Sequence, residues 1–180
     1  MQSNLNIYRI EQDEQIESFD CGDDDLNEFI LKEATLYRNE LLAVSYAVVD
    51  TTISKTVAYF SLANDRISLS DFKDKTEFNR FRKKRFVNEK RLKSYPATKI
   101  CRLGVDVSAR GLRIGSQLLD FIKSYFIIDN KTGCRFLTVD AYAAAIPFYE
   151  KNGFILLNDE DRDSATRLLF FDLKSFDVCK

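Results

Sequence analysis

A turn with the composition of a phosphate-binding loop lies near the middle of the chain. Residues 110–116 read Arg-Gly-Leu-Arg-Ile-Gly-Ser, after a strand-like segment and before a segment with helical apolar spacing. Amide N–H groups at a helix start have no acceptor within the helix and lie at the positive end of its dipole, so they bind anions. Glycine at 111 and 115 lets backbone approach a phosphate closely, and Arg110 and Arg113 could add charge-assisted contacts. The alternative is an ordinary strand-to-helix turn that uses glycine for its geometry.

A short aromatic segment contains the second candidate for chemistry. Residues 148–154 read Phe-Tyr-Glu-Lys-Asn-Gly-Phe, with Tyr149 in a short predicted helix. Taken alone, this segment favours a structural role, in which Phe148 and Phe154 belong to the core and Tyr149 is a half-buried packing residue.

The composition restricts the available chemistry. The chain contains no histidine, which excludes Ser-His-Asp and Cys-His catalysis and the common histidine-containing metal sites. We expect reduced, mostly buried thiols and no metal site, because the four cysteines are scattered: Cys21, Cys101, Cys134 and Cys179. No apolar run is long enough to span a bilayer, and the N-terminus lacks the pattern of a signal peptide. The expected location is therefore the cytoplasm, without a membrane partner.

Apolar periodicity predicts one mixed α/β domain over residues 1–180. The predicted strands cover residues 5–10, 43–50, 56–63, 100–107, 135–141, 154–157 and 166–173. The predicted helices cover residues 24–39, 72–94 (as one helix or two), 114–126 and 145–152. We expect Pro96 to end the second helical segment and Gly153 to cap the last helix. The crossover between residues 107 and 135 implies that the strands on either side of it are parallel.

Together, the turn and the aromatic segment resemble the GNAT family of acyl-CoA N-acyltransferases. Residues 110–115 are similar to its cofactor motif, Q/R-x-x-G-x-G/A, and residues 148–154 are similar to its F-Y-x-x-x-G-F signature. Three further segments resemble the GNAT toxins of toxin–antitoxin modules: residues 19–30, 58–63 and 102–106. The likeness covers most of the chain from about residue 19 to residue 173.

The resemblance implies a GNAT fold, with a mixed sheet splayed between the strands near residues 100–107 and 135–141 and flanked by helices. It implies acetyl-CoA as the cofactor, with the strand near residue 105 pairing with the pantetheine arm and polarising the thioester carbonyl. Tyr149 matches the family position that protonates the leaving thiolate. The cofactor-binding residues that it implies are Leu103, Gly104, Val105, Val107, Arg110, Gly111, Leu112, Arg113, Ile114, Gly115 and Ser116.

One residue departs from the family's cofactor motif, because Arg113 stands where the motif has glycine. If this position needs an unusual backbone conformation, arginine there costs about 1 kcal/mol or more. If the position is already helical, Arg113 costs nothing and can contact a phosphate. We favour the second interpretation.

The implied function is transfer of acetyl to a primary amine, and the sequence does not identify that acceptor. An α-amino group, with a pKa near 7.7–8.0, is an easier acceptor than lysine near 10.4. Asp106 and Asp140 are candidate bases, although a role in capping or orienting backbone suits both better. A second hypothesis is a toxin that acetylates the α-amine of aminoacyl-tRNA and is bound by an antitoxin protein. A third is a non-catalytic GNAT-fold binding module, and a homodimer is also open.

A basic segment is relevant to the RNA hypothesis. Residues 80–93 contain eight Lys and Arg and one acid, which leaves 19 basic and 27 acidic residues in the rest of the chain. Cations that neutralise phosphates bind RNA with a strong dependence on salt. The candidate RNA-binding residues are Arg80, Arg82, Lys83, Lys84 and Arg85. The alternative is that these charges only solvate an exposed helix face.

Overall fold

The computed structural model describes residues 4–128, 130 and 132–176, so Cys179 lies outside the described residues. The strands are β1 (Leu5–Arg9), β2 (Val44–Asp50), β3 (Lys55–Ser68), β4 (Ser94–Val105), β5 (Phe136–Tyr142), β6 (Ile155–Leu156) and β7 (Thr166–Asp172). The helices are α1 (Asp24–Glu28), α2 (Ala34–Asn39), α3 (Lys75–Arg85), α4 (Ile114–Ile128) and α5 (Ile146–Lys151). A π-helical stretch over Phe29–Glu33 joins α1 to α2. The predicted order of strands and helices is confirmed.

The seven strands form a mixed sheet in the order β1-β2-β3-β4-β5-β7-β6. The chain divides into two compact units, which are described separately. Unit 1 contains Met1–Ala63 and Ile100–Ile122, and unit 2 contains Asn64–Lys99 and Lys123–Lys180. Within the described residues, no helix combines the length and the apolar character needed to cross a membrane.

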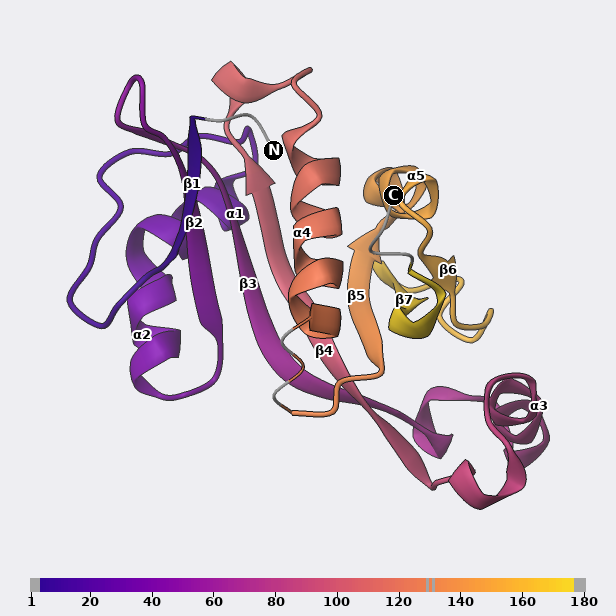
Figure 1. Ribbon diagram of the computed structural model, residues 1–180. Coiled ribbons are helices and arrows are strands. Elements are labelled where there is room, and N and C mark those ends of the chain that lie inside the picture. The colour runs from indigo at the N-terminus through magenta and orange to yellow at the C-terminus, as the bar shows by residue number, and fades with distance from the viewer. Residues whose placement is uncertain (1–3, 129, 131, 177–180) are drawn as a thin grey trace. The chain divides into compact units, whose positions relative to one another are not determined.

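Unit 1 is built on the antiparallel strands β1, β2 and β3, which lie side by side in Figure 1. Neighbouring residues of a strand point to opposite faces of its sheet. Tyr59 accordingly belongs to a cluster with Phe29 and Ile30 of the π-helical stretch, whereas the ring of Phe60 lies 6.2 Å from that of Phe121 on α4. Helices therefore cover both faces of these strands.

Unit 2 is built on a parallel pair and an antiparallel group. β4 pairs in parallel with β5 over three positions, from Ala97 to Lys99, which confirms the predicted parallel pair. β5, β7 and β6 then pair in antiparallel fashion. α3 contributes Phe78 and Phe81 to an aromatic cluster that also contains Tyr95, Phe136 and Phe170. This cluster fixes the basic segment to the sheet.

The prediction that Pro96 ends a helix is wrong. α3 ends at Arg85, and β4 already begins at Ser94, six residues before the predicted strand. Proline has no N–H to donate, but the Pro96 carbonyl accepts a hydrogen bond from the Arg135 amide at 3.0 Å. A strand tolerates proline where only its carbonyl is used.

Candidate functional site

The turn after β4 in unit 1 is anchored by the carboxylate of Asp106, which is 1% exposed. This carboxylate accepts hydrogen bonds from the Lys55 ammonium at 2.9 Å, from the Ser108 amide at 2.9 Å and from the Asp20 amide at 3.2 Å. Burial alone would raise the pKa of Asp106, but hydrogen bonds from Ser108, Lys55 and the backbone outweigh it and lower the pKa to about 2. Asp106 therefore caps and orients the turn, and it is too weak a base to accept a proton from an amine.

The same turn is fastened to a segment more than 80 residues earlier in the chain. The Val107 amide donates to the Asp20 carbonyl at 2.8 Å, and Arg110 Nη2 donates to the Cys21 carbonyl at 2.6 Å. The family resemblance implies that Arg110 binds a phosphate, but one of its guanidinium nitrogens already donates a hydrogen bond within the protein. Its contact with a phosphate stays a prediction.

The start of α4 presents main-chain amides of the kind that bind anions. The Gln117 amide donates to the Arg113 carbonyl at 3.1 Å, which begins the helical hydrogen-bond series. The amides of residues 114–116 precede that bond, so the helix itself offers them no acceptor. Residues 110–113 are exposed, and Gly115 and Ser116 are half-buried. A phosphate group is a suitable acceptor for such amides.

Arg113 is not helical, so the favoured interpretation of this residue is wrong. Its φ is 59°, in the left-handed region, and the φ of Gly111 is 83°. An L-residue in that region costs roughly 1–2 kcal/mol, whereas glycine adopts it without steric cost. The glycine of the family motif is thus explained by backbone conformation, and Arg113 adopts this conformation under strain.

Gly104 is required by packing. A Cβ at this position would lie 2.7 Å from the Tyr59 ring and 3.2 Å from the Phe19 ring. Tyr59 cannot withdraw easily, because its hydroxyl donates to the Leu26 carbonyl at 2.7 Å. The neighbouring Leu103 and Val105 are half-buried, and Val107 is exposed. The pairing of this strand with a pantetheine arm stays a prediction.

The aromatic segment of unit 2 forms a helix end of the Schellman type. The Phe154 amide donates to the Tyr149 carbonyl at 3.0 Å, and the Gly153 amide donates to the Glu150 carbonyl at 2.9 Å. Gly153 has a φ of 84°, which confirms the predicted cap. The rings of Tyr149 and Phe154 lie 5.5 Å apart, as the apolar contact of this motif requires. The spacing of the signature is therefore the spacing of a helix cap.

Tyr149 lies on α5 and is 7% exposed. Its ring lies at 5.1 Å from that of Phe148. Burial raises the pKa of Tyr149 to about 12, so the phenol stays protonated at neutral pH. No described residue forms a hydrogen bond with its hydroxyl. The side chain is thus fixed by its ring, and the O–H can donate to a substrate.

Lys123 fixes α5 and was not found by sequence reasoning. It is 3% exposed, and its ammonium donates to the carbonyl of Asn152, the C-terminal cap of α5, at 2.8 Å. The ammonium also lies 4.5 Å from the centre of the Phe171 ring and 5.2 Å from that of Phe176. A cation at a helix C-terminus and over aromatic faces is stabilising. Only its apolar surroundings on α4 could have suggested burial.

The other candidate base, Asp140, is paired. Its carboxylate lies 2.6 Å from the Lys99 ammonium, across the β4–β5 pair. Neither aspartate that the sequence singles out is therefore an unengaged base. Among residues 4–128, 130 and 132–176, no cluster of three or more His, Cys, Asp or Glu side chains could hold a metal ion. Cys21 and Cys134 are buried free thiols.

The five predicted RNA-binding residues of unit 2 divide into two groups. Arg82 donates to the Arg91 and Leu92 carbonyls at 3.4 and 3.2 Å. Arg85 lies 4.2 Å over the Phe81 ring, donates to the Phe81 carbonyl at 3.1 Å and pairs with Asp172 at 3.8 Å. These two arginines therefore stabilise the fold through contacts within the protein.

The second group is exposed and consists of Arg80, Lys83 and Lys84. Their charged groups have no hydrogen bond or ion pair with any residue that the structure describes. Among the five predicted RNA-binding residues, these three present charge that no described residue neutralises. The predicted cofactor-binding residues all belong to unit 1, and Tyr149 and the predicted RNA-binding residues to unit 2.

Residues 81–156 match the model of the acetyltransferase (GNAT) domain family. This range contains the turn before α4 and the Tyr149 signature. This match and the order of the mixed sheet agree with the GNAT resemblance that the sequence motifs indicate.

Solved structures of the same fold extend over nearly the whole chain. A tyrosine-to-phenylalanine mutant of KacT has a TM-score of 0.75 and 25% identity, covering 96% of each chain. AtaT complexed with acetyl-methionyl-tRNAfMet has a TM-score of 0.74 and 23% identity, covering 95% of this chain and 96% of that chain. AtaTR bound with AcCoA has a TM-score of 0.74 and 24% identity, covering 96% of this chain and 95% of that chain. A comparison with curated protein sequences finds no match.

Proposed function

We propose that this protein is an N-acetyltransferase that transfers acetyl from acetyl-CoA to a primary amine. The observation that carries the proposal is the start of α4, where helix-start amides follow a short exposed turn. The GNAT domain match and the fold shared with AtaTR bound with AcCoA support it. The residues fit the cofactor, because the amides of residues 114–116 suit its diphosphate.

In this proposal, the binding residues act mainly through their backbone. The amides of residues 114–116 receive the diphosphate, and the exposed Arg113 side chain adds charge beside it. The β4 backbone over residues 103–107 pairs with the pantetheine arm, and one of its amides donates to the thioester oxygen. When bound, acetyl-CoA supplies the activated acyl group, and the chain's own groups orient it.

Tyr149 is the proposed general acid. Its pKa of about 12 keeps the proton in place until a thiolate forms. That value lies above the ordinary thiol pKa of about 8.5, so the phenol keeps its proton until negative charge develops on the sulfur. Tyr149 therefore donates its proton to the leaving sulfur as the thiolate forms, and water then reprotonates the phenolate. The amine loses its proton to water, since Asp106 and Asp140 are both engaged.

The acceptor that the chain favours is the α-amine of aminoacyl-tRNA. The specific observation is the trio of exposed, unpaired cations on α3, Arg80, Lys83 and Lys84. An α-amine is partly neutral near pH 8, so it reacts without a strong base. AtaT, which shares the fold, was solved with acetyl-methionyl-tRNAfMet and also bound to the C-terminus of the antitoxin AtaR. A toxin with an antitoxin partner, acting in the cytoplasm where its substrates are made, follows from this acceptor.

The test is an acceptor screen with labelled acetyl-CoA. The panel contains free amino acids, lysine peptides, peptides with a free N-terminus and aminoacyl-tRNA, and acetyl-CoA binding is followed separately by thermal shift. We expect a shift with acetyl-CoA and label in the tRNA-linked α-amine. Gly115→Asp should abolish the shift, because it places an acid at the diphosphate. A thermal shift without transfer to any acceptor would favour a non-catalytic binding module, and no shift at millimolar cofactor would refute the proposal.

A further inference from the structure

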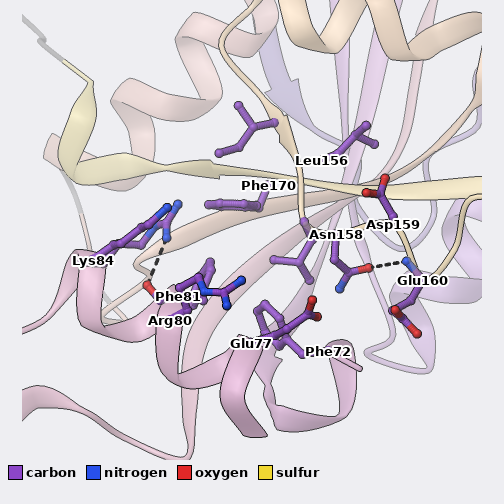
Figure 2. Close-up of a pocket in the computed structure, with 13 residues that line it drawn as sticks. Phe72, Glu77, Arg80, Phe81, Lys84, Leu156, Asn158, Asp159, Glu160 and Phe170 are labelled. Carbon is purple, nitrogen blue, oxygen red and sulfur yellow. Dashed lines mark hydrogen bonds between the residues drawn. The ribbon is translucent and has the colours of Figure 1, made fainter. Parts of the chain in front are cut away.

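A hollow in unit 2 lies between α3 and the chain that follows β6. Its volume is about 300 Å³, and thirteen residues line it. Figure 2 shows Lys84 and Arg80 on one side of this hollow, and Asp159 and Glu160 on the other. The volume is at the lower end of the range for ligand pockets, so it suits one small group of a larger ligand.

The wall of the hollow is aromatic and aliphatic. Phe81 and Phe170 are 7% and 2% exposed and form its base, together with Leu156. Phe72 is half-buried, so part of its ring faces the hollow. A flat ring system stacks on such a side chain whatever its detailed chemistry.

One side of the hollow carries positive charge that the fold does not use. Arg80 and Lys84 are exposed, and neither has an ion-pair partner in the described parts of the chain. The same two residues also line a second hollow of about 420 Å³, together with Lys83. These cations therefore form a ridge with a hollow on each side. A chain of phosphates can follow such a ridge, whereas a free amino acid or nucleotide would use only one hollow.

Hydrogen-bond acceptors also line the hollow, on α3 and on the chain after β6. Asn158 is committed, because its amide group donates to the Asp71 carbonyl and its oxygen accepts from the Glu160 amide at 2.9 Å. Glu77, which also lines the hollow, has a buried Oε2 without a hydrogen-bond partner among the described residues. A buried carboxylate oxygen without a donor is costly, and a small side-chain rotation would let a ligand N–H satisfy it.

We propose that this hollow binds one unpaired nucleotide of an RNA, with its phosphates on Arg80 and Lys84 and its base against Phe72. Because the Glu77 Oε2 of α3 is an unsatisfied acceptor, the hollow prefers bases with an exocyclic amine, such as cytosine and adenine, over uracil. This inference rests on the RNA acceptor proposed above, and it assigns that RNA a contact on α3 distinct from the acetyl-transfer chemistry.

The test measures binding of labelled hexanucleotides C6, A6 and U6 by fluorescence anisotropy, without acetyl-CoA. We expect C6 and A6 to bind at least about tenfold more tightly than U6, since a hydrogen bond to a charged acceptor discriminates by that much. Glu77→Gln can donate as well as accept, so it should remove most of this preference. Glu77→Ala should remove it too, without a new donor.

The cations are tested by salt dependence. Arg80→Gln and Lys84→Gln should each weaken all three ligands and lower the slope of log Kd against log salt by about 0.7. Lys93→Gln is the matched control, because Lys93 is an exposed cation of the same segment that lines neither hollow. Thermal unfolding checks that each variant is folded.

Three results would overturn the inference: no oligonucleotide bound at low salt, equal affinity for C6 and U6, or equal loss in Lys84→Gln and Lys93→Gln. The first would leave the hollow to a protein partner. Because these assays contain no acetyl-CoA, they succeed or fail independently of acetyl transfer. Acetylation of a small amine together with absent RNA binding would refute this inference and keep the proposed enzyme.

Discussion

The strain at Arg113 gives a prediction that separates backbone from charge. Arg113 has a φ of 59°, so replacing it with glycine removes a steric cost of roughly 1–2 kcal/mol. Glycine also makes the unfolded chain more flexible, which offsets about 0.5–1 kcal/mol of that gain. Arg113→Gly should therefore stabilise the protein by about 0.5–1 kcal/mol. For a chain of this length, the melting temperature should rise by about 1–4 °C.

The control is Arg113→Ala, which removes the same charge but keeps a Cβ in the left-handed region. Its melting temperature should stay within about 1 °C of the original value, measured by circular dichroism in the same buffer. Calorimetric titration with acetyl-CoA then reports the charge alone: both variants should weaken binding equally if the guanidinium contacts the diphosphate. A lower melting temperature in Arg113→Gly, or an equal rise in both variants, would refute the argument from strain.

Three further predictions concern Gly104, Lys123 and Asp106. Gly104→Ala should lower the free energy of unfolding in urea by about 1–3 kcal/mol, because its Cβ would lie 2.7 Å from the Tyr59 ring. An unchanged urea midpoint would show that the Tyr59 ring moves aside without cost. Lys123→Met should lower the free energy of unfolding by at least about 1.5 kcal/mol, because it removes the hydrogen bond to Asn152. An unchanged free energy would show that this hydrogen bond does not stabilise the fold. Asp106, with its pKa lowered to about 2, stabilises the fold fully above pH 4 and loses this stabilisation as pH falls toward 2. The free energy of unfolding, measured against pH from 7 to about 2, should show this loss in the original protein and not in Asp106→Asn. Identical pH profiles for the two proteins would contradict the prediction.

The elements of the fold were predictable where apolar periodicity is strong. The alternation in β2 and the helical spacing in α4 indicate their types without tertiary information. The sequence does not indicate the start of β4, because Pro96 favours a helix end and nothing local shows that only its carbonyl forms a hydrogen bond. A proline shows that one backbone N–H is absent, but it does not show whether the surrounding backbone is helical or extended.

The sequence motifs indicate where the candidate site residues lie, but not what contacts their side chains make. The motif located the α4 turn and Tyr149, and the Schellman cap explains why Gly153 follows at its spacing. The ion pair of Arg85 could not be predicted from the sequence, because its partner Asp172 is 87 positions away. The anchoring of the turn by Lys55 is similarly long-range. Which charges are exposed and which serve the fold is decided by contacts between distant segments.

The central claim is that Tyr149 donates a proton during acetyl transfer from acetyl-CoA, and single-turnover kinetics of Tyr149→Phe test it most directly. The variant keeps the ring that packs against Phe148 and Phe154, so folding and acetyl-CoA affinity should be unchanged. The rate of transfer to the best acceptor should fall by about 10²–10⁴ at pH 7–8, the usual loss of a general acid. A rate equal to that of the original protein, with the cofactor bound equally well, would contradict the account.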